Sequence, residues 1–497
     1  MPVKLRLILF YFFVILFFVL SPIFMFYSLG YRMNFKTFRL ERLGMISIRT
    51  LPDEAAIQLN GKIQRQKSPA RMANLLPGKY LVQISKNECR PWMGEVQVKA
   101  NWVTRLESII LFPKKIEFVP VTEFVVQKFF VSPKSRKMIF LGESEDERGL
   151  WLLDMLLEEE TLILDERQLD AYGLKSAFMA GDAGIHWSKD ERAVVIEKDG
   201  QFFLLDLKKP NRITALKDLM GFEPDQIAWS DRTAGSFFYR FQGGIGKYFF
   251  RRKKTEANLL TDAGTFHYQD GFIYYIEKKD GMIWRWSEDF LEKIPMVQIP
   301  EFDPEARYEI IVNPLGDLLA HKLQVDVLKD QNVFYELNTS KKFEGIHAAI
   351  WEKSGKGLLL TGKQKCIFMQ ESSSKVKDEN VSQPEEIMIP QEIKNIFWFD
   401  STKLMLLSRR KAFLRQLGVE SESYTQEIFS FSPGGKEAYW DARFKQLYLI
   451  EALAGQTGGK LIRYNLAQGP LSKLMQNVRE TMSDGIQLLY EVRKNND

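Results

Sequence analysis

Three patterns of apolar and polar residues divide the chain into three parts. Residues 7–31 carry no charge and are largely apolar. From Gly44 to Phe112, apolar and polar residues alternate along short stretches. Beyond residue 113, short apolar stretches recur at a nearly constant interval, each followed by polar turn residues. The three patterns predict a membrane helix, a small β-sandwich and a repeat fold of β-sheets.

The uncharged stretch from Leu7 to Tyr31 is long enough to cross a membrane as a helix. About 20 apolar residues span the hydrocarbon core of a bilayer, and no strand of a globular protein runs this long. We therefore expect residues 1–43 to comprise a cytoplasmic tip, a transmembrane helix kinked near Pro22, and a juxtamembrane segment. A cleaved secretory signal is the alternative, because Ser28-Leu29-Gly30 offers a small-x-small cleavage pattern.

The charges that flank this stretch do not decide its orientation. Two basic residues precede it and four follow it closely: Lys4 and Arg6, then Arg32, Lys36, Arg39 and Arg42. Because basic residues favour the cytoplasmic side, the two flanks compete on nearly equal terms.

Four short stretches between Gly44 and Phe112 place apolar residues at every second position. These residues are Ile46 and Ile48, Ile57 and Leu59, Tyr80, Val82 and Ile84, and Val96 and Val98. A period of two with one polar face predicts a small antiparallel sandwich. Asn60-Gly61 predicts a tight hairpin turn, and Pro77-Gly78 predicts a second turn.

The same part of the chain contains six short motifs in a characteristic order. They are Gly44–Ile48, Pro52–Ala55, Ile57–Lys62, Pro69, Leu76–Tyr80 and Pro91-Trp92. In this order they resemble the PEGA domain of bacterial surface proteins, over about Gly44 to Phe112. Two departures occur: the name-giving tetrapeptide reads Pro-Asp-Glu-Ala, and Glu88-Cys89 stand where the family usually has Gly-Tyr.

The resemblance implies an adhesion or cell-wall-associated module rather than an enzyme. It also favours export of the C-terminal bulk of the chain. We therefore expect a single-pass protein of the plasma membrane whose bulk is extracytoplasmic. If the family's Gly-Tyr contacts a ligand, the change at Glu88-Cys89 puts that contact in doubt.

The third part repeats an apolar or aromatic residue followed by a polar turn. The recurring position is occupied by Val131, Trp187, Trp229, Tyr268, Val312, Trp351, Trp398, Trp440 and Met482. Successive differences between these residue numbers are 56, 42, 39, 44, 39, 47, 42 and 42. Units of this length with four short strands are typical of β-propeller blades.

We therefore expect residues 113–497 to form a seven- or eight-bladed β-propeller, in a mainly β protein. The count is eight if Met482–Val492 adds closing strands to the first blade, and seven if one unit is irregular. The aromatic-Ser-x-Asp turn resembles that of the WD-repeat-like and TolB-like propellers. The polar run Ser372–Glu386 is interpreted as a solvated loop, with a partner-binding tail as the alternative.

Charge and cysteine content argue against a nucleic-acid partner and against a fold held together by disulfides. The net charge of +5 arises from 69 basic and 64 acidic residues, which indicates a mixed surface and no nucleic-acid partner. The basic runs Arg251–Lys254 and Arg409–Lys411 are interpreted as solvated hairpin edges. Cys89 and Cys366 fall in different predicted domains, which excludes a disulfide framework.

Histidine offers the clearest candidate for a metal or sugar site, and packing is the simpler interpretation. The chain has His186, His267, His321 and His347. The first two each lie one residue before the aromatic marker of their repeat, so both could line an inner strand. The other repeats have mostly apolar residues there, such as Phe130 and Ile350, and we expect no metal.

Other suggestive motifs fail on spacing. Gly243–Lys247 lacks the first glycine and the hydroxyl residue of a phosphate loop, so we expect a hairpin turn. The acidic runs Glu143–Glu147 and Glu158–Glu160 lack calcium-loop spacing and are interpreted as loop charges. The tryptophan markers are interpreted as core and register residues rather than a glycan platform.

The sequence thus predicts no catalytic residue, no cofactor and no metal. We expect a non-catalytic envelope protein that binds, adheres or acts as a scaffold through its PEGA-like and propeller domains. Cell-wall glycan or an envelope protein would be the partner. The alternatives are a propeller enzyme acting on envelope polysaccharide, and a sensor or assembly subunit of a membrane complex.

Overall fold

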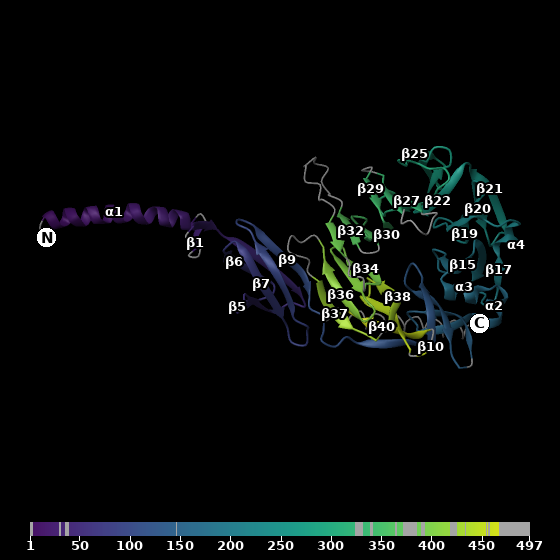
Figure 1. The fold of residues 1–497 in the computed structure, drawn as a ribbon, viewed down its shortest axis with the longest axis horizontal. Helices are drawn as coiled ribbons and strands as arrows, with labels where there is room; N and C mark the ends of the chain where they lie inside the picture. Colours follow the sequence, from purple (N-terminus) through teal and green to yellow (C-terminus); the bar gives the residue numbers. More distant parts are fainter. Residues whose placement is uncertain are drawn as a thin grey trace, which may run out of the picture. The chain divides into compact units, whose positions relative to one another are not determined.

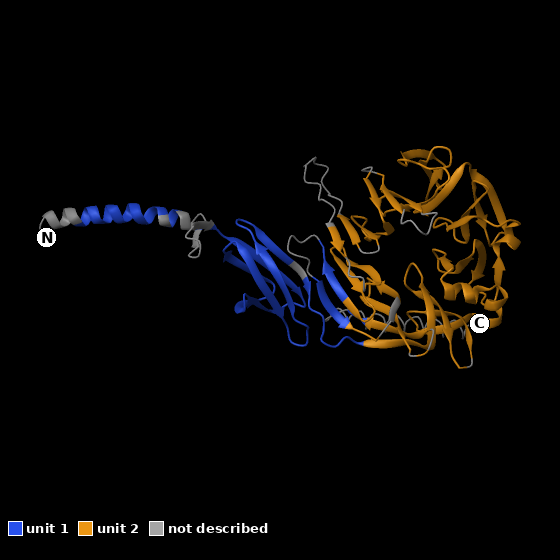
Figure 2. Cartoon of the chain, viewed as in Figure 1, with its two compact units in different colours: residues 1–117, 413–429, 465–478 blue, residues 118–412, 430–464, 479–497 orange. Residues whose placement is uncertain are grey.

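The structure is a computed structural model of the chain. It describes residues 3–28, 31–34, 39–145, 147–323, 332–337, 341–362, 365–370, 385–388, 393–417, 425–432, 434–453, 455 and 458–466. Figure 2 shows two compact units, and each is described by itself. The first comprises residues 1–117, 413–429 and 465–478, and the second comprises residues 118–412, 430–464 and 479–497. The polar run at 372–384 and the marker at Met482 lie outside the described residues.

The N-terminal uncharged stretch is helical. Helix α1 spans Val3–Ser28, and its side chains are described at residues 9–22, 24 and 25. The described phenylalanines are exposed, as at Phe17 (66%) and Phe18 (70%). Across the described part of the chain, no helix combines the length and the apolar character needed to cross a membrane. Strands β1 (Tyr31–Asn34) and β2 (Arg39–Arg42) follow as an antiparallel pair.

The alternating part of the chain forms two sheets, drawn in dark blue in Figure 1. One has the order β6-β3-β9, with β3 at Gly44–Leu51, β6 at Ala70–Leu75 and β9 at Val103–Ile110. The other has the order β5-β4-β7-β8, with β4 at Ala56–Leu59, β5 at Lys62–Lys67, β7 at Gly78–Ser85 and β8 at Trp92–Val98. We call this pair of sheets the sandwich.

The predicted inward face is the core of the sandwich. Ile46, Ile57, Val82, Ile84 and Val98 are each at most 1% exposed and belong to one cluster. The prediction of a wholly antiparallel sandwich is wrong at one edge, because β9 pairs with β3 in parallel. The chain reaches β9 from the opposite sheet, and alternation reports which side chains face inward but not the strand direction.

The two predicted turns differ in detail. Asn60 and Gly61 join β4 to β5 with φ angles of 47° and 78°, as a two-residue primed turn requires. Pro77 precedes β7, which begins at Gly78. Pro52–Ala55 forms a tight link between β3 and β4, in which Glu54 has a φ of 63°.

Beyond residue 117, most strands belong to sheets made of four consecutive antiparallel strands. Three of these sheets are β14 (Ala183–Trp187), β15 (Ala193–Lys198), β16 (Gln201–Asp206) and β17 (Ile213–Ala215); β18 (Gln226–Trp229), β19 (Ser236–Phe241), β20 (Gly244–Phe249) and β21 (Lys254–Leu260); and β22 (Ala263–Gln269), β23 (Phe272–Glu277), β24 (Met282–Ser287) and β25 (Lys293–Gln298).

Three further four-stranded sheets follow the same order. They are β26 (Arg307–Val312), β27 (Leu318–Leu323), β28 (Val333–Glu336) and β29 (Lys341–Glu344); β30 (Ile346–Trp351), β31 (Gly357–Gly362), β32 (Lys365–Gln370) and β33 (Glu385–Met388); and β34 (Asn395–Asp400), β35 (Lys403–Leu407), β36 (Lys411–Gln416) and β37 (Thr425–Ser430). The predicted blade pattern is confirmed in these six sheets.

The remaining strands join the beginning and the end of the repeats in one seven-stranded sheet. Its order is β13-β12-β11-β10-β40-β39-β38, with β10 at Phe118–Val131, β11 at Lys137–Glu143, β12 at Arg148–Asp154, β13 at Glu159–Asp165, β38 at Gly434–Asp441, β39 at Gln446–Ala452 and β40 at Gly459–Asn465. The first part of β10 pairs mainly with β40, and its later part with β11. Counting β10 twice, the described strands make eight groups of four.

The strand at this junction is one that the repeat analysis did not identify. Strand β10 joins the first and last groups and begins at Phe118, well before the first marker at Val131. Met482–Val492, to which the eight-blade alternative assigned closing strands, lies outside the described residues. A continuous strand that serves two groups shows no break in its apolar pattern, so the repeat analysis missed it. We call residues 118–466 the propeller-like region.

From the β14–β17 sheet to the β26–β29 sheet, the first strand of each sheet contacts the first strand of the next sheet. β14 contacts β18, β18 contacts β22, and β22 contacts β26. Short helices lengthen two connections: α2 (Glu166–Ala171) and α3 (Leu174–Ala180) precede β14, and α4 (Leu216–Met220) precedes β18. The insertion of α2 and α3 explains why the first repeat interval is the longest.

Candidate functional site

In seven repeats, a polar residue that follows the marker builds the turn between the first and second strands of the sheet. Its side-chain oxygen accepts a backbone N–H from further along the turn. The acceptor and donor pairs are Ser132 and Lys137 (3.0 Å), Ser188 and Ala193 (3.0 Å), Ser230 and Thr233 (3.1 Å), Asn313 and Asp317 (2.7 Å), Glu352 and Ser354 (2.8 Å), Asp400 and Thr402 (2.8 Å), and Asp441 and Arg443 (2.9 Å). These local bonds give the repeat its polar signature.

The turn between the third and fourth strands lies beside the turn between the first and second. Backbone N–H groups of Leu207, Phe250 and Glu288 donate to the carbonyls of Arg192, Gly235 and Gly271, at 2.9, 3.1 and 2.9 Å. Both kinds of turn therefore lie along one edge of the sheets, which we call the front rim. The turns between second and third strands lie along the opposite edge, the back rim.

A buried ion pair lies beneath the front rim, where two neighbouring sheets meet. Lys247 of β20 and Glu288, which follows β24, are 2.5 Å apart, and each side chain is 8% exposed. Glu288 also accepts the hydroxyls of Ser230 (3.0 Å) and Thr233 (3.3 Å). Tyr268 of β22 lies 2.6 Å from the second carboxylate oxygen. The opposite charges and these hydrogen bonds offset part of the cost of removing the two groups from water.

Tyr268 joins this cluster to a second carboxylate. Its hydroxyl is 2.5 Å from Asp231 and 2.6 Å from Glu288, and it has a single proton to donate. Burial, followed by the hydrogen bonds to Asp231 and Glu288, raises the pKa of Tyr268 above its usual range. The phenol therefore stays neutral and acts as a hydrogen-bond donor, so the cluster holds two sheets together rather than presenting a reactive group.

The turn that contains Glu288 presents two apolar side chains to solvent. Phe290 is 79% exposed and Leu291 is 70% exposed. The Phe290 N–H donates to the Ser287 hydroxyl at 3.2 Å, and the Leu291 N–H donates to the Ser287 carbonyl at 2.9 Å. The exposed tip is therefore held at its base by a buried carboxylate and a hydrogen-bonded turn.

Two of the tryptophan markers connect neighbouring sheets. The indole N–H of Trp229 donates to the His186 carbonyl at 2.8 Å, and that of Trp398 donates to the Ile350 carbonyl at 3.0 Å. Trp229 is 6% exposed. These contacts fit the core and register role that the sequence predicts for the markers.

The histidines are distributed among separate sheets. His186 of β14 lies 2.7 Å from Glu197, whose pKa is held below its usual range by this hydrogen bond. His267 of β22 is two sheets further along, with the β18–β21 sheet between them, and burial lowers its pKa. His321 stacks on Phe334 with 4.0 Å between ring centroids. The structure thus does not bring His186 and His267 together as a pair.

No metal site is present among the residues that the structure describes: nowhere do three His, Cys, Asp or Glu side chains converge. The acidic runs form ion pairs: Glu143 pairs with the half-exposed Arg148, and Glu158 pairs with Arg463, whose side chain is 12% exposed. Burial raises the pKa of the Cys89 thiol, which favours the protonated form rather than a nucleophilic thiolate.

The glycine-rich run is a hairpin turn, as its spacing predicts. Gly243 has a φ of 77° and lies between β19 and β20. The sequence interpretation missed Lys247 at its end, which belongs to the buried ion pair. The sequence did offer one signal of a buried charge: Lys247 lies inside a strand, close to the apolar residues Ile245 and Tyr248.

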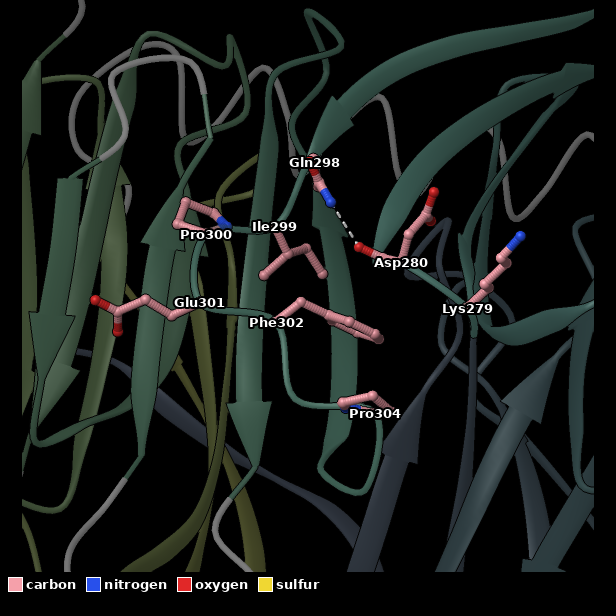
Figure 3. Close-up of a pocket in the computed structure, with 8 residues that line it drawn as sticks. All are labelled: Lys279, Asp280, Gln298, Ile299, Pro300, Glu301, Phe302 and Pro304. Carbon is pink, nitrogen blue, oxygen red and sulfur yellow. Dashed lines mark hydrogen bonds between the residues drawn. The ribbon is translucent and has the colours of Figure 1, made fainter.

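A pocket of about 440 Å³ lies on the back rim, between the β23–β24 turn and the connection to β26 (Figure 3). Gln298 donates to the Asp280 carbonyl at 2.9 Å across one side. Phe302 stacks on Tyr308 with ring centroids 5.2 Å apart and packs so closely on Gly281 that a Cβ there would clash with the ring. The other lining residues are Lys279, Ile299, Pro300, Glu301 and Pro304. Phe302 is thus engaged by other parts of the protein. In Figure 3 the charged ends of Lys279, Asp280 and Glu301 point away from the other lining residues.

Comparison with known families identifies the sandwich. Residues 43–109 match the PEGA domain. The resemblance inferred from the six motifs is thereby confirmed for this part of the chain. No curated protein matches the sequence.

Solved structures that resemble the chain include β-propellers. The Dos1 propeller has a TM-score of 0.43 at 11% identity, over 71% of this chain and 95% of its own. Kluyveromyces lactis Hsv2 has a TM-score of 0.38 at 11% identity, over 61% and 98%. Oligogalacturonate lyase from Vibrio parahaemolyticus has a TM-score of 0.34 at 9% identity, over 71% and 95%. The strand order, rather than these distant likenesses, supports the propeller-like description.

Proposed function

We propose that this protein is a non-catalytic binding protein of the cell envelope. Its N-terminal helix holds it in the plasma membrane, and the bulk of the chain lies on the extracytoplasmic side. The PEGA module binds cell-wall glycan, and the propeller-like region presents its rims to further partners.

The observation that carries this proposal is a row of side chains across the outer face of the sandwich. Strand register places Ile63, Gln58, Gln83 and Met93 opposite one another across β5, β4, β7 and β8. Ile63 is 73% exposed and Met93 is 54% exposed, with two half-buried amides between them. Directly paired residues of antiparallel strands share a face, so the four side chains form one strip.

This strip has the chemistry that a glycan requires. Apolar side chains pack against the C–H faces of sugar rings, and each amide can both donate to and accept from sugar hydroxyls. Leu81, which is 46% exposed, lies on the same face as Gln83 and extends the apolar area. The strip lies on regular strands, which hold it rigidly and so lower the entropy cost of binding.

Membrane anchoring is supported by the sequence of the N-terminal segment. The uncharged stretch from Leu7 to Tyr31 exceeds the length that a bilayer requires. A C-terminal reporter enzyme that is active only in the cytoplasm should be silent, and a reporter active only after export should be active. The reverse result would contradict export. An intact mass for the membrane-extracted protein would exclude cleavage after Gly30.

Wall binding is tested by cosedimentation of the detergent-solubilised full chain with purified sacculi. We expect Ile63→Ser with Met93→Ser to weaken binding about tenfold, since each removes a contact worth roughly 0.5–1 kcal/mol. Phe290→Ser with Leu291→Ser is the matched control, because it removes two more exposed apolar side chains at the front rim. Equal loss in both variants, or no sedimentation of the unmodified chain, would contradict the proposal.

A further inference from the structure

Two neighbouring turns of the front rim carry an unusual excess of positive charge. The β16–β17 turn contains Lys208, Lys209 and Arg212, and the β20–β21 turn contains Arg251, Arg252 and Lys253. All six side chains belong to exposed residues. Among the described residues none of the six has an ion-pair partner, although the adjacent Lys254 pairs with Glu256 at 2.8 Å.

The two turns belong to sheets that pack against each other. One apolar cluster combines Val195 and Phe202 of the β14–β17 sheet with Trp229 and Tyr248 of the β18–β21 sheet. Phe250, at the base of the second turn, packs in the same cluster. Because the turns lie on the same rim above a shared core, they form one surface, which we call the basic sector.

The acidic groups of this sector are already engaged. Asp190 accepts the Ser188 hydroxyl at 2.8 Å, and Asp206 accepts the Lys208 N–H at 3.0 Å. Asp231 lies 2.5 Å from the Tyr268 hydroxyl. Asp190 and Asp231 also lie near the arginines of their own turns, Arg192 (4.0 Å) and Arg232 (3.9 Å), and none of these carboxylates forms an ion pair with the six cations. The two turns therefore keep an excess of positive charge.

Hydrogen bonds within the turns hold the charged residues in place. The Lys209 N–H donates to the Asp206 carbonyl at 2.9 Å, and the Arg252 N–H donates to the Phe249 carbonyl at 3.2 Å. Each turn is also joined to the neighbouring turn of its own sheet through Leu207 or Phe250. Two fixed groups of three cations favour a ligand with several anionic groups over a single small anion.

The composition of the sector distinguishes between classes of partner. In the two sheets that carry the sector, residues 183–260, no described large apolar side chain is exposed, and the exposed Phe290 and Leu291 belong to the turn of the next sheet. A membrane-surface site combines basic residues with inserted apolar ones, and a protein interface is depleted in lysine and enriched in aromatic anchors. Neither description fits. A flexible polyanion does fit, because it is held chiefly by charge contacts along its length.

We propose that the basic sector binds a linear polyanion of the cell envelope, a polymer with repeated phosphate groups that spans both turns. The inference rests on the proposed extracytoplasmic location. The overall charge balance predicted no such partner, since it could not show that the fold brings two basic turns together. Arginine and lysine both pair with phosphate oxygens, arginine through two parallel N–H groups.

The test measures binding of fluorescent long-chain polyphosphate to the full chain in neutral detergent, by anisotropy over a range of salt concentrations. For a flexible strand, the logarithm of the binding constant falls with the logarithm of salt by about 0.7 per contact. We expect Arg251→Gln/Arg252→Gln/Lys253→Gln to lower that slope by about 2. The same loss is expected for Lys208→Gln/Lys209→Gln/Arg212→Gln.

The matched control is Lys62→Gln/Arg65→Gln/Lys67→Gln on β5, which removes three exposed cations from the sandwich. It should leave the slope unchanged. An equal loss in the control, loss from only one of the two turns, or no binding by the unmodified chain would overturn the inference. Sacculus sedimentation that still depends on Ile63 and Met93 would show that the wall-binding proposal stands independently.

Discussion

The sandwich and the propeller-like region differ in the polar side chains that they bury. The sandwich core is entirely apolar, and its buried polar side chains, Thr50 and Ser68, bond each other at the margin of the sheets. The propeller-like region buries a full ion pair, Lys247 with Glu288, between two of its sheets. The propeller-like region also buries polar residues that close its turns, such as Ser188 and Ser230.

The largest expected difference concerns the buried ion pair. Replacing Glu288 by Ala should leave Lys247 charged, buried and unpaired, and lower the free energy of unfolding by about 3–5 kcal/mol. Peptide-resolved hydrogen exchange in denaturant would show whether the loss is confined to residues 118–466. Asp289→Ala is the control, because its pair with Arg232 is half exposed and should contribute no more than about 1 kcal/mol. If Glu288→Ala and Asp289→Ala lowered the free energy of unfolding equally, the buried ion pair would not distinguish the propeller-like region from the sandwich.

An intermediate effect is expected at the margin of the sandwich. The Ser68 hydroxyl bonds Thr50 and accepts the Ala55 N–H at 3.0 Å. Ser68→Ala should cost about 1–3 kcal/mol, because it leaves the buried Ala55 N–H without its acceptor and removes the bond to the Thr50 hydroxyl, which still donates to the Pro52 carbonyl at 2.7 Å. Adding Thr50→Val should cost less than the sum of the single changes, since both partners are then apolar. Chemical denaturation of the four proteins gives the coupling, and strict additivity would contradict it.

A smaller and stabilising effect is expected at two turns of the sandwich. Glu54 and Glu88 each have a φ of 63°, in the left-handed region. They occupy the positions where the PEGA family has glycine, which accepts this backbone without a steric penalty. Glu54→Gly and Glu88→Gly should each stabilise the sandwich by about 1 kcal/mol. Gly61→Ala, at a φ of 78°, should destabilise it. A melting temperature lowered by both glycine variants would contradict the assignment.

The smallest effect is a difference in pH dependence. All four histidines lie outside residues 44–112, and burial lowers the pKa of His267. Below the ordinary histidine pKa of about 6.5, the unfolded chain takes up a proton that the folded chain does not, so stability falls as the pH is lowered. Between pH 7 and 5.5, the protection of amides 263–269 from hydrogen exchange, measured relative to the intrinsic rate at each pH, should fall, and His267→Gln should reduce this change. An equal loss of protection in the sandwich would contradict this difference between the two regions.

Much of the architecture follows from local patterns. Alternation identified Ile46, Ile57 and Val82 as core residues because a strand buries every second side chain. The Asn60-Gly61 turn was predictable because few residue pairs accept two positive φ angles. The repeat markers were visible because seven of them are followed by a polar residue that closes a turn with its own neighbours, as Ser188 does.

Features that depend on distant segments were missed for a common reason. The partner of Lys247 could not be predicted, because Glu288 lies 41 residues further along the chain and belongs to a neighbouring sheet. The strip from Ile63 to Met93 depends on strand register across four strands. The basic sector depends on two turns, 208–212 and 251–253, that belong to different sheets. Sequence separation hides such neighbours.

The sequence by itself determined the apolar N-terminal helix, the PEGA module and the repeated four-stranded units, because each arises from periodicity or from contacts within a few residues. Only the tertiary structure decided the parallel pairing of β9 with β3, the use of β10 by two groups of strands, and the placement of charge. These depend on which segments meet after the chain has crossed between sheets. Contacts between residues that are distant in the sequence leave no local pattern, so they can be identified only from the assembled sheets.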